Sequence, residues 1–272
     1  MLTALAWRIA LVGVFAAHGA SAAQTPAEDA RVEGAVGLIV RHGPEFSGAR
    51  DTVWRATPAG FLRWGRITLT GAGGFTTRAD ETVERGLSAE ISRRGHLRLT
   101  LGLRSDAGRD DRDSPELAGL GPVRRTVRAR LAARWDPDPD WRVTAGWSVD
   151  ALGRGQGYFM DVAASRRWSI NGGDSLWIGV SASGAGDRYM QLWHGVSPAQ
   201  SVASGLPEYR AAEGLRDLHL SLTWRNELGL GAQRFGVYTA LDASRLLGSA
   251  ADSPITRRRS ALTGSAGLVW SF

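Results

Sequence analysis

The chain contains no cysteine, so disulfides, thiolate nucleophiles and cysteine metal sites are excluded. It also contains no lysine, because all 33 basic residues are arginine, and the formal net charge is +6. Basic proteins that bind nucleic acid usually gather their positive charge in one patch. Here the arginines recur along the chain at the spacing of a β-strand. We therefore expect no nucleic-acid partner.

A third absence is that of a long hydrophobic run. After residue 22 no apolar stretch reaches the roughly 20 residues that a membrane-spanning helix needs. Mean hydropathy is −0.18, a value typical of soluble proteins. That criterion fails for β-barrels, because lipid-facing and lumen-facing residues alternate and their hydropathies average out. The chain does hold 35 glycines and 11 tryptophans, which suits a twisted sheet with tight turns and aromatic residues at membrane interfaces.

The N-terminus carries the features of an export signal. Arg8 precedes an apolar run over residues 9–17, and residues 20–22 read Ala-Ser-Ala, the small-x-small pattern that signal peptidase recognises. The alternative is a membrane anchor that stays in place, but the apolar run is too short to span a bilayer. We expect a signal peptide over residues 1–22 and an exported domain over residues 23–272.

Apolar residues at every second position dominate the rest of the chain. Leucine occupies alternate positions over residues 97–103, a period of two that no amphipathic helix produces, and the pattern recurs over residues 127–135 and 218–224. Marking all such segments gives about twelve strands. They begin near Arg31, Thr52, Arg66, Thr82, Gly95, Arg124, Trp141, Tyr158, Asp174, Leu215, Gln233 and Arg257. The prediction is an all-β fold, an antiparallel up-and-down transmembrane β-barrel in the outer membrane of a Gram-negative bacterium.

Connections between these strands alternate in length. Short turns are expected at residues 60–65, 92–95, 136–140, 169–173 and 226–232, and we assign them to the periplasm. Longer polar connections over residues 105–123 and 184–214 are assigned to the outside, where residues 153–157 form a short exception. An even number of strands then places both ends of the exported domain on the periplasmic side.

The last strand carries the strongest signal of a barrel. Leu262, Leu268 and Trp270 fall on one face together with the terminal Phe272. A terminal aromatic residue after alternating apolar residues is similar to the signal that the outer-membrane assembly machinery recognises. We expect this strand to pair with the first one, because a membrane sheet cannot leave an open edge in lipid.

One hairpin can be predicted in detail. Arg93, Arg94 and Gly95 form its loop, and Gly95 adopts the left-handed conformation. Matching the two faces pairs Ile91 with Leu97 and Ala89 with Leu99 on the lipid side, and Glu90 with Arg98 and Glu84 with Arg104 in the lumen.

Charged side chains dominate the predicted lumen. Alternation places there Glu84, Glu90, Arg98, Arg104, Arg128, Arg130, Arg134, Arg142, Asp150, Asp161, Asp217 and Asp242, among others. In one interpretation these charges pair across strands and fill the barrel. In the other, the excess of arginine makes an anion-preferring channel for small solutes.

No catalytic, cofactor or metal site is expected. The five histidines have no metal-ligand spacing. His219 and Ser221 are neighbours on one strand face and could in principle be a base and a nucleophile, as in lipid A deacylases. However, the leucines between them take the lipid face, where acyl chains lie, so we expect a hydrogen-bonded network in the lumen instead.

Several motifs resemble a known family. From His194 the chain reads HGVSPAQSVASGLPEYRAAEGLRDL, then LLGSAADSPI, and it closes with GLVWSF. Residues 44–48 read PEFSG, with Phe46 where tyrosine is more usual. The chain thus resembles the MipA/OmpV family, most specifically in residues 195–209 and 246–254. The loop motif residues are Gly195, Gly205, Leu206, Pro207 and Tyr209, which we expect to fold over the barrel mouth.

The resemblance implies an interaction protein. The family's named member binds the lytic transglycosylase MltA and helps to join it to a peptidoglycan synthase, so these partners, together with outer-membrane lipid and lipopolysaccharide, are expected for this chain. Asp136, Asp138 and Asp140, in a turn with two prolines, are the candidate periplasmic anchor. Trp135 and Trp141 on either side of this turn should lie opposite one another on the outer surface. The alternative function is the small-solute channel.

Overall fold

The computed structural model describes residues 32–71, 86–171, 173–230 and 233–272. The predicted signal peptide over residues 1–22 and its boundary lie outside these ranges, as does Glu84. Residues 31–272 form one compact unit. Among the described residues, no helix is long and apolar enough to cross a membrane.

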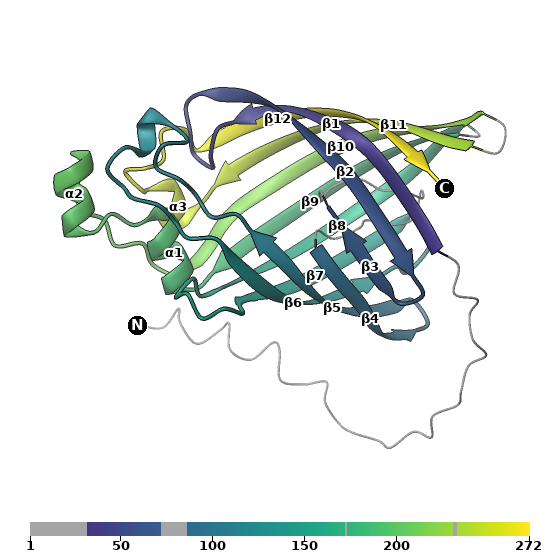
Figure 1. Ribbon diagram of the computed structural model, residues 1–272, viewed down its shortest axis with the longest axis horizontal. Coiled ribbons are helices and arrows are strands. Elements are labelled where there is room, and N and C mark those ends of the chain that lie inside the picture. The colour runs from purple at the N-terminus through teal and green to yellow at the C-terminus, as the bar shows by residue number, and fades with distance from the viewer. Residues whose placement is uncertain (1–31, 72–85, 172, 231–232) are drawn as a thin grey trace, which may run out of the picture. The chain divides into compact units, whose positions relative to one another are not determined.

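Twelve strands of the described residues form one closed antiparallel barrel (Figure 1). Each strand pairs with its neighbours in sequence, and β1 closes on β12. The strands are β1 (Val32–Pro44), β2 (Thr52–Trp64), β3 (Ile67–Thr70), β4 (Gly86–Arg94), β5 (Leu97–Asp106), β6 (Thr126–Trp135), β7 (Trp141–Asp150), β8 (Tyr158–Asn171), β9 (Asp174–Ala185), β10 (Gly214–Leu230), β11 (Gln233–Leu246) and β12 (Ser260–Ser271). The predicted fold class and number of strands are confirmed.

The outer face of the barrel is apolar. Leu101, Leu220 and Leu268 are 51–62% exposed, whereas Val269, the inward neighbour of Leu268, is 6% exposed. Large apolar side chains that point outward from a closed sheet are stable only if lipid covers them. The alternation that predicted the strands therefore also predicted their faces, and the barrel is of the transmembrane kind.

The two ends of the barrel differ. The connections at one end are short turns, whereas the other end carries long loops with η1 (Pro115–Leu117), α1 (Asp187–His194), α2 (Pro198–Ser204) and α3 (Gly248–Ala251) (Figure 1). The turn at residues 136–140 lies where it was predicted. The turns predicted at 60–65, 169–173 and 226–232 are shorter than expected, because β2, β8 and β10 continue to residues 64, 171 and 230.

The seam between β1 and β12 is continuous to the end of the chain. Ala35 pairs with Ser271, and Gly34 and Phe272 exchange backbone hydrogen bonds of 3.1 and 2.9 Å. The Phe272 ring lies against Gly34, where any Cβ would meet it. The predicted pairing of the first and last strands is confirmed.

The predicted β4–β5 hairpin is correct in its glycine and wrong in its register. Gly95 has φ of +54° as predicted, but the strands continue to Arg94 and resume at Leu97. Ala89 pairs with Leu101 instead of Leu99, and Ile91 has no partner because the register shifts between Glu90 and Ser92. A β-bulge adds one residue and inverts the alternation beyond it, but only Ser92, Arg93 and Arg94 follow in this strand, so no apolar residue reveals the change.

The two tryptophans beside the 136–140 turn both point outward, as predicted, and are 50% and 40% exposed. They are not opposite one another, because Trp135 pairs with Val143. Strand pairing therefore ends two residues earlier on β7 than a symmetric hairpin would require. Trp141 is therefore displaced from Trp135 by two residues along the outer face.

Candidate functional site

The lumen beneath the long loops holds a chain of paired charges, and Arg128 is the most deeply buried of them. Arg128 is 1% exposed, and its Nε donates to the Asp106 carboxylate at 2.6 Å while Nη2 donates to Gln156 at 2.8 Å. Its guanidinium lies 5.3 Å from the ring centre of Phe159 and 5.1 Å from that of Tyr189. The carboxylate and the two rings stabilise the charge where water is excluded.

Arg130 lies on the same strand, two residues further into the barrel. Its Nη1 and Nη2 donate to the two carboxylate oxygens of Asp161 at 2.6 and 2.8 Å, and Nη1 also lies 3.2 Å from the Ser148 hydroxyl. Gly146 makes this arrangement possible, because a Cβ at that position would overlap the guanidinium. The glycine is therefore required by a neighbouring side chain and not by a turn.

A third pair joins the barrel wall to the loops. Arg216 donates from Nε to Asp217 at 2.7 Å and from Nη1 to the Tyr189 hydroxyl at 2.7 Å. Asp217 also accepts a hydrogen bond of 2.6 Å from Ser183. Since Tyr189 belongs to α1, this network connects the loop helix to strands on the lumen side.

His219 is held between two carboxylates. Its Nδ1 lies 2.9 Å from Asp242, and its Nε2 lies 3.5 Å from Asp217. Ser221 donates to the carbonyl of Gly179 at 3.3 Å. A general base needs a ring nitrogen directed at its nucleophile. Both nitrogens of His219 are directed at carboxylates, so the geometry matches the predicted lumen network and not a catalytic pair.

The long loops pack into a folded cap over this end of the barrel. One apolar cluster contains Tyr189, Met190 and Ala250, with Phe159 of β8 against it. A second cluster joins Leu117, Leu120, Val196 and Ile255, and Phe46, Leu206 and Tyr209 pack against it. These residues come from four different connections. We call this assembly the loop cap; it has its own hydrophobic core.

The family motif residues build the loop cap. Gly205 ends α2 with φ of +73°, and a Cβ on Gly195 would overlap Gln191. Tyr209 pairs with Val196 through two backbone hydrogen bonds of 2.9 Å, and its hydroxyl donates to the carbonyl of Ser249 at 3.0 Å. Leu206 is half-buried and Pro207 is exposed. The motif therefore has a structural explanation, that of positioning the cap.

Burial changes the acid–base behaviour of one residue in the cap. His194, the last residue of α1, is 5% exposed. Burial, with smaller contributions from the positive charges of Arg216 and Arg109, lowers its pKa to about 4. The imidazole is therefore neutral at physiological pH.

Glu90 and Arg98 lie nearer the short turns, whereas Arg104 lies at the level of Arg128. Glu90 forms an ion pair with Arg98 at 3.0 Å although it stands opposite Thr100 in the ladder. Arg104 pairs in register with Arg128. Among the residues that the structure describes, no group of three acidic or histidine side chains could hold a metal ion.

The three aspartates of the 136–140 turn already have partners within the barrel. Asp136 accepts hydrogen bonds from Arg134 at 2.9 Å and Arg142 at 3.2 Å. Burial alone would raise the pKa of Asp136, but these hydrogen bonds and positive charges lower it below its usual value. Asp138 accepts from two backbone N–H groups of the turn, and Asp140 lies 3.6 Å from Arg167. Asp140, at 52%, is more exposed than Asp136, at 30%.

Sequence reasoning missed Tyr189, Arg216 and Gly146. Tyr189 and Arg216 lie in or beside the connection over residues 186–213, whose fold depends on contacts that no strand pattern encodes. Gly146 could have been noticed as a small residue facing the lumen within a strand, a position that often marks a close approach.

The chain is similar to one protein family and to several solved structures. A family model described as MltA-interacting protein MipA matches residues 36–272. No curated protein is similar enough in sequence to count as a relative. Among solved structures, OccK11 (OpdR) of Pseudomonas aeruginosa is 10% identical with a TM-score of 0.35, covering 89% of this chain and 96% of that one. The NanC porin is 9% identical with a TM-score of 0.40, covering 85% and 98%. OmpT of Vibrio cholerae is 7% identical with a TM-score of 0.38, covering 89% and 97%.

Proposed function

The chain belongs to the MltA-interacting protein (MipA) family, and from this premise we propose that it is an outer-membrane scaffold for peptidoglycan-remodelling enzymes. The proposed partners are a lytic transglycosylase and a peptidoglycan synthase. We further propose that residues 1–22 are removed on export. The outer-membrane assembly machinery then inserts residues 23–272, with Trp270 and Phe272 as part of the signal that it recognises.

The buried charge network near the loop end of the lumen is the observation that favours a scaffold over a channel. Arg128, Ser148 and Gln156 are at most 1% exposed, so water does not reach them. The lumen arginines Arg128 and Arg130 are engaged by Asp106 and Asp161, which leaves little of their charge for a passing anion. Loop contacts above them cover this level of the barrel. Such a barrel is better suited to binding partners on its surface than to passing solutes through its lumen.

The partner surface then lies at the end with short turns, which faces the periplasm in barrels of this kind. Asp138 and Asp140 are exposed in one of these turns. Such turns offer a contact area below about 1,200 Å², the range of transient complexes. We therefore expect a weak complex that requires several turns at once.

The test is capture of a purified lytic transglycosylase by the full-length barrel in detergent. Asp140→Asn removes an exposed carboxylate of the turn and should weaken capture by up to about fivefold, as for an exposed charge pair. Asp136 and Asp138 are poor choices for this test, because they hold the turn together. Barrel folding is checked by heat-modifiable gel mobility.

Asp110→Asn is the matched control, since Asp110 pairs with Arg112 in a loop at the opposite end of the barrel. Capture that responds equally to both substitutions would reflect net charge and not docking. Capture unaffected by Asp140→Asn would remove this turn from the interface. No capture by the wild-type barrel would refute the scaffold proposal for this partner.

A further inference from the structure

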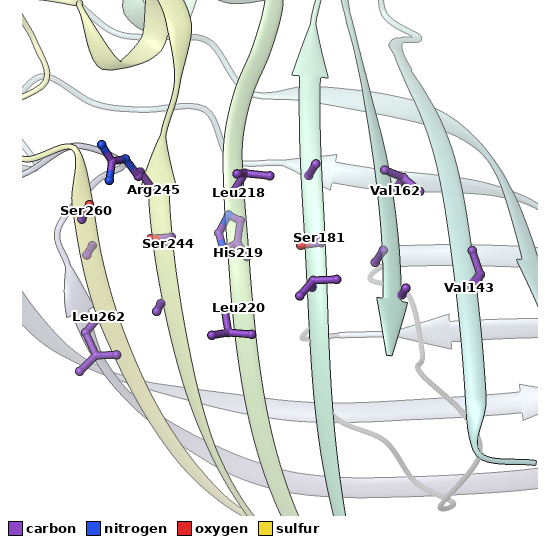
Figure 2. Close-up of a pocket in the computed structure, with 16 residues that line it drawn as sticks. Val143, Val162, Ser181, Leu218, His219, Leu220, Ser244, Arg245, Ser260 and Leu262 are labelled. Carbon is purple, nitrogen blue, oxygen red and sulfur yellow. The ribbon is translucent and has the colours of Figure 1, made fainter. Parts of the chain in front are cut away.

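A groove of about 950 Å³ crosses six strands, from β7 to β12 (Figure 2). Each strand from β8 to β12 contributes three consecutive residues to the lining of the groove. The first and third of these residues point outward. The next inward side chains on these strands, including Asp161, Asp217 and Asp242, do not line it. The groove therefore lies on the outer, lipid-facing surface of the barrel.

Two rows of outward side chains form its walls. Strand register places Ala182, Leu218, Arg245 and Ser260 side by side in the first row. Val180, Leu220, Ala243 and Leu262 form the second row. Alanines in both rows leave depth between leucines that are 45–62% exposed. The volume falls within the roughly 300–1,000 Å³ of small-molecule sites.

The groove is polar at one end only. Arg245 and Ser260 lie on β11 and β12, while the lining of β7 to β9 consists of valine and alanine apart from Ser181 (Figure 2). Arg245 is exposed, and among the described residues it has no ion pair or side-chain hydrogen bond. Arg257 and Arg258, exposed in the preceding loop, add positive charge nearby. An unpaired guanidinium facing lipid needs an anion, and its fork fits phosphate.

We propose that this groove binds a phosphorylated glycolipid of the outer leaflet, with one acyl chain between the two rows and a phosphate on Arg245. The polar end of the groove lies next to the long loops, which places the phosphate at the outer surface of the membrane. The apolar acyl chain would lie along the apolar part of the groove. The charged headgroup would lie at its charged end. This inference rests on the transmembrane barrel and not on the proposed enzyme partners.

The test is native mass spectrometry of the full-length protein in detergent, with three probes. These are a bis-phosphorylated hexa-acyl lipid A, its dephosphorylated form, and phosphatidylglycerol. The wild-type protein should retain the phosphorylated lipid A about fivefold better than the dephosphorylated form, the effect of one arginine near an anionic headgroup. Arg245→Gln should abolish that preference, and Arg245→Lys should keep most of it.

Arg210→Gln is the matched control, because Arg210 is also exposed near the long loops and lies outside the groove. Ala182→Trp should fill the groove and lower retention of both forms of lipid A; Ala243→Leu is the second variant if the first fails the gel-mobility test of folding. Unchanged preference in Arg245→Gln, or equal retention of phosphatidylglycerol and lipid A, would overturn the proposal. A lytic transglycosylase takes no part in this experiment, so its outcome is independent of the scaffold test.

Discussion

Arg128 and Arg130 carry their charges in a poorly hydrated part of the barrel, where they are 1% and 7% exposed. Each charge is matched by one carboxylate, Asp106 or Asp161, and by neighbouring polar or aromatic groups. Breaking a buried pair costs far more than the pair contributes, because the remaining charge stays desolvated. Small residues that leave room for the pairs are therefore as important as the charges.

Gly146→Ala tests this relation, because the added methyl group displaces the Arg130 guanidinium from its place between Ser148 and Asp161. We expect a loss of about 1–3 kcal/mol in the free energy of unfolding, the range for a disturbed buried polar contact. Urea unfolding in detergent, followed by tryptophan fluorescence, measures it. Gly264→Ala is the control, since a Cβ there has only an ordinary contact with Leu241. Equal losses in both variants would contradict the proposed role of Gly146.

At the scale of the element, α1 is the part of the loop cap that reaches the lumen. Tyr189 contacts Phe159 at 5.5 Å between ring centres and binds Arg216 through its hydroxyl. Arg109 donates to the carbonyl of Trp193 at 3.0 Å, and Ser253 donates to that of His194 at 2.6 Å. The helix is thus fixed from the barrel wall and from two other loops.

His194 makes the stability of this element depend on pH. Its pKa in the folded protein, about 4, lies below the ordinary value of 6.5, so the unfolded chain binds more protons between these values. Stability should be full above pH 6.5 and fall by up to about 3 kcal/mol as the pH drops toward 4. Urea unfolding across this range, compared with His194→Gln, measures the effect. A variant with the same pH dependence as the wild type would show that another group is responsible.

Sequence patterns predict the elements of this barrel far better than they predict the cap. Alternation over residues 97–103 fixes a strand and both of its faces, because one side must contact lipid. It does not reveal the bulge at Ile91, because the residues that follow in β4 are all polar and cannot show the change of face. Nor does it bring Tyr189 to Arg216, since that contact depends on how four connections pack together. The ion pair of Glu90 with Arg98 was predicted and is present, although the register differs. The pair of Arg130 with Asp161 was not predicted, because it joins two strands that are not neighbours.

At the scale of the whole molecule, we expect the loop cap and the paired charges to restrict passage through the barrel. In planar bilayers the wild-type protein should therefore show little or no conductance at neutral pH. Tyr189→Ala removes the ring over Arg128 and Arg216 and should raise conductance severalfold. Val202→Ala, a change at the 89% exposed position of α2, is the control. Large, anion-selective currents through the wild-type barrel would favour the channel over the scaffold.

The seam between Gly34 and Phe272 also sets the order of events during biogenesis. The strands that close the barrel are separated by almost the whole chain, so the ring cannot close until its last strand has arrived. Until then β1 presents an unpaired edge that lipid cannot satisfy. A polypeptide that stops before β12 would retain two such edges. Lipid could not satisfy the backbone groups of these edges, so only a chain that includes β12 can form the closed transmembrane barrel.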